Sequence, residues 1–366
     1  MAAKERDYKS ALHQKKGVDP PAPINPSPSG NKGKMKGNIR SAAEYAEGIR
    51  AGNRALLSKA ITLVESSLES HQEIAREIID RCLPFSGRSM RLGITGVPGV
   101  GKSTFIEALG RYLTGKGHKL GVLAIDPSSK RSKGSILGDK TRMEELASDP
   151  DAYIRPSPTG GSLGGVARKT REAIILCEAA GFDIIFVETV GVGQSETTVN
   201  AMVDFFLLLM LAGAGDELQG IKKGIMEMAD AIVINKADRD NLRKANLARK
   251  EYENALHLFP PNENGWTPQA LTCSALEKRG IDDIWKTVQE FLTLTRKNGH
   301  FEQKRREQAI EIMHTAINEA LHSHFSSDPA VQDKLRMTEN EVLKGNLSPY
   351  HAAHQLVNRF LDRFNK

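Results

Sequence analysis

One short stretch, Arg91 to Phe105, constrains the fold more than any other part of this 366-residue chain. It reads RLGITGVPGVGKSTF, in which an apolar segment, a glycine-rich loop matching G-x-x-x-x-G-K-[ST] and a segment suited to a helix follow one another. Glycines let such a loop turn its backbone N–H groups inward around an anion, and the start of the helix adds a positive dipole end. The strand–loop–helix context therefore predicts a site for nucleotide phosphates.

The loop and the first turn of the helix supply the predicted phosphate contacts. They are Gly96, Val97, Pro98, Gly99, Val100, Gly101, Lys102, Ser103 and Thr104. We expect Lys102 to reach the β- and γ-phosphates and to take part in catalysis, and the Ser103 hydroxyl to bind Mg²⁺. The alternative is a glycine-rich turn with an incidental Lys-Ser pair, which would leave the flanking strand and helix unexplained.

Composition narrows the class of protein. Hydrophobic residues make up 39% of the chain and aromatic residues 5%, as is typical of an α/β protein. The longest apolar run, Phe205 to Ala214, is too short to span a bilayer and predicts a strand buried on both faces. The net charge is +6, but much of the excess lies in the tail that ends near Arg40. No aromatic and basic RNA-binding signature accompanies it, so we expect neither a nucleic-acid nor a membrane partner.

The cysteines and the N-terminus bear on the compartment. Cys82, Cys177 and Cys273 are far apart and lie in apolar contexts, which predicts buried thiols in a reducing compartment. The N-terminus lacks the apolar core of a secretory signal and is a poor transit peptide. A cytoplasmic location is the expectation.

Strands and helices alternate over the middle of the chain, which predicts a mainly parallel sheet with helices on both faces. The expected strands are Arg91–Thr95, Leu120–Ile125, Ala152–Arg155, Ile184–Val187, Phe205–Leu211, Ala231–Asn235 and Ala270–Cys273. In such a sheet, ligands bind where the strands end, so the chemically active residues should follow them.

The two ends of the chain differ from this middle part. We expect residues 1–40 to form a disordered basic tail, 41–84 an N-terminal helical arm that packs on the nucleotide domain, 85–295 the P-loop domain and 296–366 a C-terminal helical extension. Helices at both ends suggest an oligomer interface. His351 and His354 are three residues apart on one predicted helix face, but surface histidines are the favoured interpretation.

Two further segments carry carboxylates after buried strands. Asp126 follows the strand that ends at Ile125, and Asp139 lies in the polar loop beyond it. Either could hold Mg²⁺ directly or through water, although Asp139 could instead cap a helix. Glu188 follows the strand Ile184–Val187 at the Walker B position and is a predicted Mg²⁺ ligand or catalytic group. Gln194 in the next loop is a candidate for positioning water, and an ordinary loop amide is at least as good an interpretation.

The choice of base rests on the segment that reads INKAD. Asn235, Lys236 and Asp238 form N-K-x-D directly after a strand, and the Asp238 carboxylate can accept from the guanine ring N–H and exocyclic amine. Ser274, Ala275 and Leu276 follow the last strand and match the loop that completes the base pocket. Adenine offers no such pair of donors, so the pattern favours GTP over ATP.

With these segments assembled, the chain resembles the GTPase family associated with methylmalonyl-CoA mutase. The resemblance rests on GVPGVGKSTFIE, LAIDPSS, GSILGDKTRM, YIRPSPTGGSLGG, ETVGVGQSE, GDELQGIKKGIMEMAD, NKAD and SAL, and covers about Tyr45 to Leu294. Bacterial members also carry the name arginine/ornithine transport ATPase, and the animal member acts in mitochondria. The resemblance places the chain in the class that includes signal-recognition-particle and nickel-insertion GTPases.

The resemblance implies a Mg²⁺-dependent GTPase that forms a homodimer through its C-terminal helices. It implies a cobalamin-dependent acyl-CoA mutase as partner, whose loading with adenosylcobalamin the GTPase gates, protects or restores. It also implies that Asp126, Asp139 and Glu188 are the carboxylates of the Mg²⁺ site, and that residues 215–224 form a switch facing the mutase. Where the family has S-G-G-S, this chain has Lys133 in a more basic loop, so the resting position of that loop is in doubt.

Slow intrinsic hydrolysis is expected, because no activating arginine can be identified; Arg142, Arg155 or a partner's arginine could serve. Two other functions remain as alternatives. One is a metal-insertion chaperone GTPase, for which the usual His-rich tracts and cysteine ligands are missing from the sequence. The other is a kinase or ATPase of an amino-acid transport system, for which no kinase catalytic loop is found.

Overall fold

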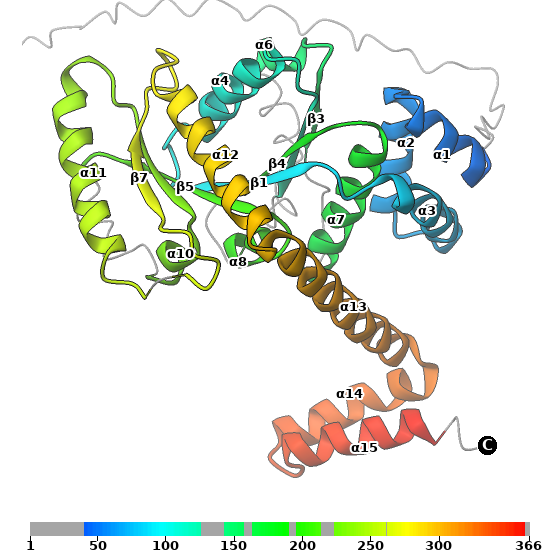
Figure 1. Cartoon of the computed structure of the whole chain (residues 1–366). Coiled ribbons are helices and arrows are strands. Elements are labelled where there is room, and N and C mark those ends of the chain that lie inside the picture. Colours follow the sequence, from blue (N-terminus) through cyan, green and yellow to red (C-terminus); the bar gives the residue numbers. More distant parts are fainter. Residues whose placement is uncertain are drawn as a thin grey trace, which may run out of the picture. The chain divides into compact units, whose positions relative to one another are not determined.

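The computed structural model describes residues 40–125, 143–156, 163–189, 195–213, 223–260 and 262–362, and from Ser41 onward these form one compact unit. Within these ranges a seven-stranded, all-parallel sheet has the order β3-β2-β4-β1-β5-β6-β7 (Figure 1). The strands are β1 (Met90–Gly96), β2 (Leu120–Ile125), β3 (Ala152–Arg155), β4 (Ile184–Thr189), β5 (Phe205–Leu211), β6 (Ala231–Asn235) and β7 (Gln269–Thr272).

All seven predicted strands are present, with ends that differ by at most two residues. Strands inside a parallel sheet are covered on both faces and read as continuous apolar runs, which is why they are easy to find. The central run is confirmed as β5, whose first six residues are all buried. β4 is longer than predicted: it continues to Thr189, because Glu188 pairs with Ile94 on one side and Ala124 on the other.

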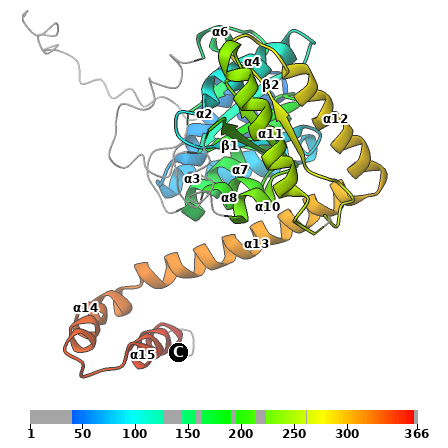
Figure 2. The ribbon, with the colours of Figure 1, turned by 90° about the vertical axis from the view of Figure 1, so that its left-hand side faces the viewer.

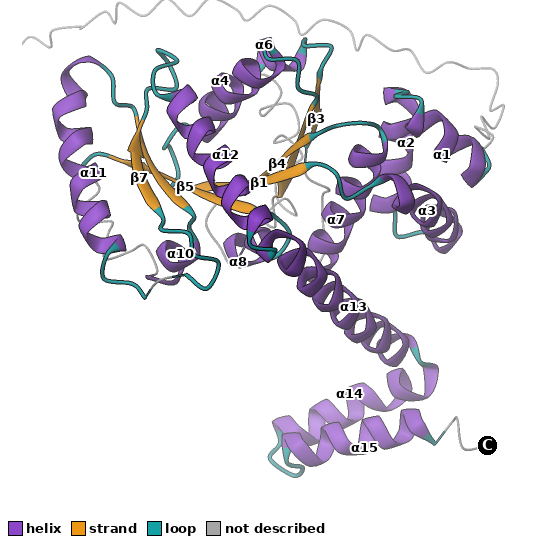
Figure 3. Cartoon of the chain, viewed as in Figure 1, coloured by secondary structure: helices purple, strands orange, loops and turns teal. Residues whose placement is uncertain are grey.

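Helices cover both faces of the sheet, as expected for this alternation of elements (Figure 3). One face packs against α4 (Lys102–Thr114), α6 (Glu144–Ala147) and α12 (Ile281–Lys297). The other face packs against α7 (Leu163–Ala179), α8 (Ser195–Asn200), α10 (Lys223–Met228) and α11 (Leu242–Leu256). Neighbouring residues of β1 and β5 point to opposite faces, so both sides of each central strand lie in the core.

The N-terminal arm, predicted to be helical over residues 41–84, consists of three helices, α1 (Ala42–Arg50), α2 (Arg54–Glu65) and α3 (Glu69–Cys82). The first break occurs at Gly52, which has a φ of 77°, and Asn53 then caps α2 by accepting from Ala55 N at 3.1 Å. The short 3₁₀ turn Leu83–Phe85 contains Pro84 and ends the segment. The arm packs on α7 and shares its core with β2 and β4.

The C-terminal residues form α13 (His300–Ser327), α14 (Pro329–Leu343) and α15 (Pro349–Leu361). Figure 2 shows α14 and α15 side by side beyond the end of α13, where the rings of Phe325 and Phe360 meet edge to face at 5.6 Å. His351 and His354 are exposed, as expected of surface histidines. Across the described residues, no helix is both long and apolar enough to span a bilayer.

Candidate nucleotide site

The glycine-rich loop connects β1 to α4, as the sequence predicts. At Gly96 a Cβ atom would lie 2.4 Å from the carbonyl oxygen of Leu209 on β5, so any larger residue would push the two strands apart. Gly101 directly precedes the first helical residue and has a φ of 90°. Residues with a side chain rarely adopt this backbone conformation. The two glycines therefore hold a tight turn at the carboxyl end of the central strand.

The start of α4 offers backbone donors at this turn. The first N–H groups of a helix have no acceptor within the helix, and Gly101 supplies no side-chain cap. Together with the helix dipole, these groups favour an anion at the loop. Ser103 lies in the same first turn and is partly exposed.

Lys102 is folded back onto its own loop. Its Nζ donates to the carbonyl oxygen of Gly96 at 2.8 Å and approaches that of Val97 at 3.5 Å. Burial lowers the pKa of Lys102, while the charges of Glu188 and Glu196 act in the opposite direction. The ammonium group is thus held by weak neutral acceptors, which a phosphate group can replace.

The Walker B strand places a carboxylate beside the loop. Glu188 is the penultimate residue of β4 and is 4% exposed, and its charge reaches Lys102. The neighbouring hydroxyls of Thr95 and Thr189 are joined at 2.8 Å, which ties the ends of β1 and β4 together. Carboxylate and hydroxyl oxygens suit Mg²⁺, so Glu188 and Ser103 fit such a site. Asp126, Asp139 and Gln194 lie outside the described residues.

Asn235 links the N-K-x-D segment to the two other predicted loops. Its Nδ2 donates to the carbonyl oxygen of Val100 at 2.9 Å, and its Oδ1 accepts from Ala275 N at 3.2 Å. The side chain of Lys236 also lies along the phosphate loop, with Nζ donating to the carbonyl oxygen of Gly99 at 2.8 Å. Three segments that are far apart in sequence therefore meet at the carboxyl edge of β1, β6 and β7.

Asp238 has a buried acceptor that no described group satisfies. Its Oδ1 is inaccessible to solvent and has no hydrogen-bond partner among the described residues. A buried carboxylate oxygen without a donor is costly, so a ligand with N–H groups is the natural partner for it. This is the atom that the guanine hypothesis assigns to the ring N–H or the exocyclic amine.

The loop after β7 is fixed from within. Ser274 N donates to the Arg279 carbonyl oxygen and Arg279 N to that of Ser274, both at 3.1 Å. Ser274 Oγ accepts from Glu277 N at 3.1 Å. Leu276 at the tip of this loop is 76% exposed, so its side chain contributes little to a core.

Sequence reasoning did not single out Glu196. It lies in α8 and is 8% exposed. Burial lowers the pKa of Lys102 overall, and the charge of Glu196, like that of Glu188, opposes this lowering. The signal was present as an acidic residue near the start of a helix that follows the Walker B loop. Its role could not be assigned because only the folded chain brings α8 back to the phosphate loop.

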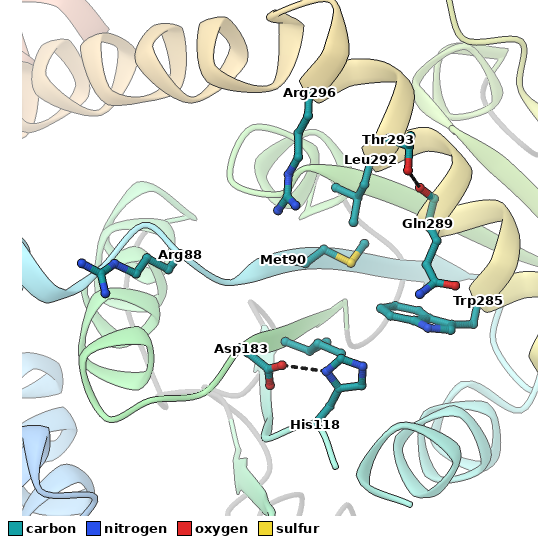
Figure 4. A pocket seen from close by; sticks show the side chains of 10 residues that line it. Arg88, Met90, His118, Asp183, Trp285, Gln289, Leu292, Thr293 and Arg296 are labelled. Atoms are coloured by element: carbon teal, nitrogen blue, oxygen red, sulfur yellow. Dashed lines mark hydrogen bonds and ion pairs between the residues drawn. The ribbon is translucent and has the colours of Figure 1, made fainter. Parts of the chain in front are cut away.

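A cavity of about 590 Å³ lies at the amino-terminal ends of β1 and β4, away from the phosphate loop. There His118 Nδ1 is 2.6 Å from an Asp183 carboxylate oxygen (Figure 4). The second carboxylate oxygen accepts from Lys119 N at 2.7 Å. These bonds pin the turn before β2 to the start of β4. Arg88 and Arg296 line the cavity from two elements, and Figure 4 shows their guanidinium groups pointing in different directions. The cavity therefore lacks a set of converging charges.

The described residues contain no group of three or more His, Cys, Asp or Glu side chains that could hold a metal ion. Cys82, Cys177 and Cys273 are free and buried, as predicted. Burial raises the pKa of Cys82 to about 11 and that of Cys273 to about 12, so both remain protonated thiols.

Comparison with known families gives this geometry its context. The family model described as the methylmalonyl-CoA mutase-associated GTPase MeaB matches residues 57–330. The chain belongs to this family. The expected resemblance is confirmed, and with it the P-loop GTPase fold and GTPase activity as the class of enzyme.

Individual relatives agree with the family assignment. A probable GTPase of Mycobacterium tuberculosis is 51% identical over 85% of this chain and 93% of its own length. The GTPase ArgK of Escherichia coli is 48% identical over 87% of this chain and 96% of its length. The mouse methylmalonic aciduria type A homolog, a mitochondrial protein, is 47% identical over 86% of this chain and 79% of its length.

A solved structure shares the fold at clear sequence similarity. The crystal structure of an LAO/AO transport system kinase is 42% identical, has a TM-score of 0.69 and covers 87% of this chain and 96% of its own. The parallel sheet and its helices are thus shared with a related protein of similar length.

Proposed function

We propose that this GTPase binds a cobalamin-dependent acyl-CoA mutase, most directly methylmalonyl-CoA mutase, and couples its nucleotide cycle to the loading, protection or reactivation of adenosylcobalamin. The observation that carries the proposal is the family match over residues 57–330, whose description names methylmalonyl-CoA mutase. The mouse relative, named for methylmalonic aciduria, supports the same partner. A cytoplasmic location is part of the proposal, in keeping with three free buried cysteines.

The nucleotide contacts belong to this proposal. We assign the phosphates to the loop Gly96–Ser103 and to Thr104 in the first turn of α4. We assign guanine to Asp238, whose Oδ1 is buried without a donor, with Asn235 and Lys236 holding the adjacent loops. Ser274, Ala275 and Leu276 would border the base.

The residues present fit a Mg²⁺ ion, which when bound would neutralise charge on the β- and γ-phosphates. Ser103 and Glu188 would hold it, with Asp126 and Asp139 proposed from sequence. Lys102 would leave the carbonyl oxygen of Gly96 and bind the phosphates, and Gln194 would orient the attacking water. The chemistry is positioning and charge stabilisation, without a covalent intermediate.

Slow turnover by the isolated protein is also proposed. Arg155, one candidate for an activating arginine, is bound to Glu65 on α2, with its Nε 3.1 Å from Glu65 Oε1. Burial acts to lower the pKa of Arg155, but the hydrogen bonds and charge of Glu65 outweigh this and the pKa is raised overall. Arg155 therefore fastens the N-terminal arm, which leaves Arg142 or a partner's arginine for the activating role.

The assembly that we propose is a homodimer formed through the C-terminal helices. Support comes from α13, whose apolar side chains at Ile310, Met313, Ile317 and Leu321 follow three- and four-residue steps and are about half exposed. Apolar side chains on one stripe of a helix favour a helical partner. Light scattering of the full chain and of a variant with serine at Met313 and Ile317 tests this, since a monomer in both would contradict it.

The decisive experiment measures GTP turnover with and without methylmalonyl-CoA mutase at equal Mg²⁺ concentration. We expect slow turnover alone and a several-fold rise with the mutase. Lys102→Ala should abolish tight GTP binding, because the ammonium contact to the phosphates is lost, and Lys116→Ala on an exposed turn is the control. Unchanged turnover and no complex would remove the mutase from the proposal and leave the GTPase assignment intact.

A second candidate function has one specific observation in its favour, the name of the LAO/AO transport system kinase structure. It predicts transfer of phosphate from nucleotide to a transport component. A phosphotransfer assay with labelled GTP and ATP and a periplasmic amino-acid-binding protein tests it. Labelled protein would favour this candidate, and hydrolysis without labelling would favour the GTPase cycle.

A further inference from the structure

Helix α8 lies directly against the strand that leads into the phosphate loop. At Gly93 in β1, an added Cβ would be 2.9 Å from Val199 Cγ1 and 2.9 Å from Val203 Cγ2. Val199 belongs to α8, and Val203 lies in the segment by which the chain leaves the helix. The absence of a side chain at Gly93 therefore allows close packing of α8 on β1.

The same helix carries Glu196 toward the phosphate site. Glu196 is buried, and its charge, like that of Glu188, opposes the lowering of the Lys102 pKa by burial. A shift of α8 along β1 would thus change the electrostatic surroundings of the phosphate-binding ammonium group.

Helix α13 is hydrogen-bonded to the segment that follows α8. Gln308 Nε2 donates to the carbonyl oxygen of Val203 at 3.0 Å, and both residues are buried. Lys304 Nζ donates to the carbonyl oxygen of Asp204, also at 3.0 Å. Without Gln308 the buried carbonyl oxygen of Val203 would lose its donor from α13, so the bond favours one position of the segment relative to that helix. Gln308 Oε1 is also buried and has no partner among the described residues, so the contact of this side chain with the segment is made through Nε2.

An ion pair between Arg305 of α13 and Asp204, the residue before β5, adds to these bonds. Arg305 forms two bonds to the Asp204 carboxylate, at 2.8 Å and 2.7 Å, and Asp204 Oδ2 also accepts from Arg91 N on β1 at 2.7 Å. The two side chains are 14% and 2% exposed. The bidentate pair and the bond from Arg91 N join α13 to β1 through Asp204, in the segment that follows α8.

We propose that Gln308 and Lys304 of α13 are positioning residues for GTP hydrolysis, which act by holding α8 and its Glu196 in register with Lys102. The inference rests on the proposed phosphate contact of Lys102, but not on the identity of the partner protein. A protein that binds the C-terminal helices and displaces α13 would therefore change the rate of GTP hydrolysis, and such a kinetic effect need not be accompanied by a change in nucleotide affinity.

The test compares two identical substitutions on one helix. Gln308→Met keeps the length of the side chain and removes its donor to Val203. Gln303→Met is the control, because Gln303 is exposed and its side-chain amide donates to Glu307 Oε1 on the same helix, at 2.9 Å. We expect Gln308→Met to lower kcat for GTP about fivefold with KM and GDP affinity unchanged, and Gln303→Met to leave all three unchanged.

A second readout separates positioning from a loss of stability. Hydrogen exchange of the backbone in residues 195–204 should be faster in Gln308→Met than in Gln303→Met at a temperature where both are folded. If Gln308→Met does not fold, Lys304→Met removes the bond to the Asp204 carbonyl oxygen and should lower kcat in the same way. It also removes a positive charge that acts on Asp230, so it is compared with the double variant Lys304→Met, Asp230→Asn, in which that effect is absent. Equal kcat in a folded Gln308→Met and its control, or a fall in nucleotide affinity instead of kcat, would overturn the proposal. Failure of the mutase hypothesis would leave this result unaffected, since the assays contain no mutase.

Discussion

At the scale of single residues, Asp238 gives the sharpest prediction. Its buried Oδ1 has no donor within the described chain, so guanine N–H groups would satisfy it. Asp238→Asn replaces an ionised acceptor with an amide that also donates, and hydrogen bonds to charged groups are worth roughly 1.5–3 kcal/mol. GTP affinity should fall about 10- to 100-fold by that estimate, and xanthosine triphosphate, which offers an oxygen in place of the amine, should regain part of it.

The control for this prediction is Asp240→Asn, a neighbouring exposed carboxylate. Titration of fluorescent GDP against both variants measures the difference. Equal affinities in the two variants would mean that guanine is read elsewhere.

Single residues also show what the sequence could and could not reveal. The phosphate loop and Asp238 follow local patterns, so their chemistry could be stated from the residue types alone. The bonds from Asn235 to Val100 and Ala275 join residues up to 135 positions apart, and no local pattern reports them. Glu196 was overlooked for the same reason, since only the packing of α8 on β1 brings it toward Lys102.

At the scale of elements, the packing of α8 on β1 depends on Gly93. A Cβ there would meet Phe206 Cδ2 at 2.8 Å as well as the two valines, all in buried side chains. Gly93→Ala should destabilise the protein by about 1–3 kcal/mol through overpacking, and should also lower GTP turnover because α8 moves. Urea unfolding followed by circular dichroism measures the first effect.

Gly121→Ala in β2 is the matched control, because a Cβ there would find ordinary contacts with Cys177 and Ile185 at 3.8 Å. It should be neutral or slightly stabilising, since alanine restricts the unfolded chain. Equal stability of the two variants would show that α8 adapts to an added methyl group without cost.

The elements differ in how readily they could be predicted. Buried parallel strands are read as apolar runs, and all seven were found. The C-terminal segment was predicted to be helical, and in the folded chain its apolar side chains at Ile310, Met313 and Ile317 on α13 are about half exposed. Periodicity indicates which face of a helix is apolar but not what covers that face. Light scattering, as proposed for the dimer, tests whether a second copy of the chain covers these side chains.

At the scale of the whole molecule, Asp230 links the pH of the solution to the stability of the fold. Its Oδ2 accepts from Phe206 N at 2.8 Å, where β5 and β6 lie side by side. Burial raises the pKa of Asp230 from 3.8 to about 6, and the charge of Asp204 adds to this, while Lys304 and the Phe206 N–H act in the opposite direction. The folded protein thus binds this proton more tightly than the unfolded chain does.

The sign of the pH effect follows from that difference. Between about pH 4 and pH 6 the folded state holds more protons than the unfolded state, so raising the pH through this window lowers the free energy of unfolding. The penalty is complete above pH 6 and amounts to at most about 3 kcal/mol for a shift of this size. Asp230→Asn keeps an acceptor for Phe206 N but cannot ionise, and therefore escapes the penalty.

We accordingly expect Asp230→Asn to gain stability relative to the wild type as the pH rises from 4 to 7, by about 1–3 kcal/mol. Urea unfolding of both proteins at several pH values gives the difference, and Asp333→Asn, at an exposed position on α14, is the control and should show no such trend. A difference that stays constant with pH would mean that Asp230 is ionised equally easily in both states. In that case the positive charge of Lys304, near the start of α13, compensates the buried negative charge of Asp230 in full. Helix α13 would then contribute to the stability of the sheet through this pair of charges.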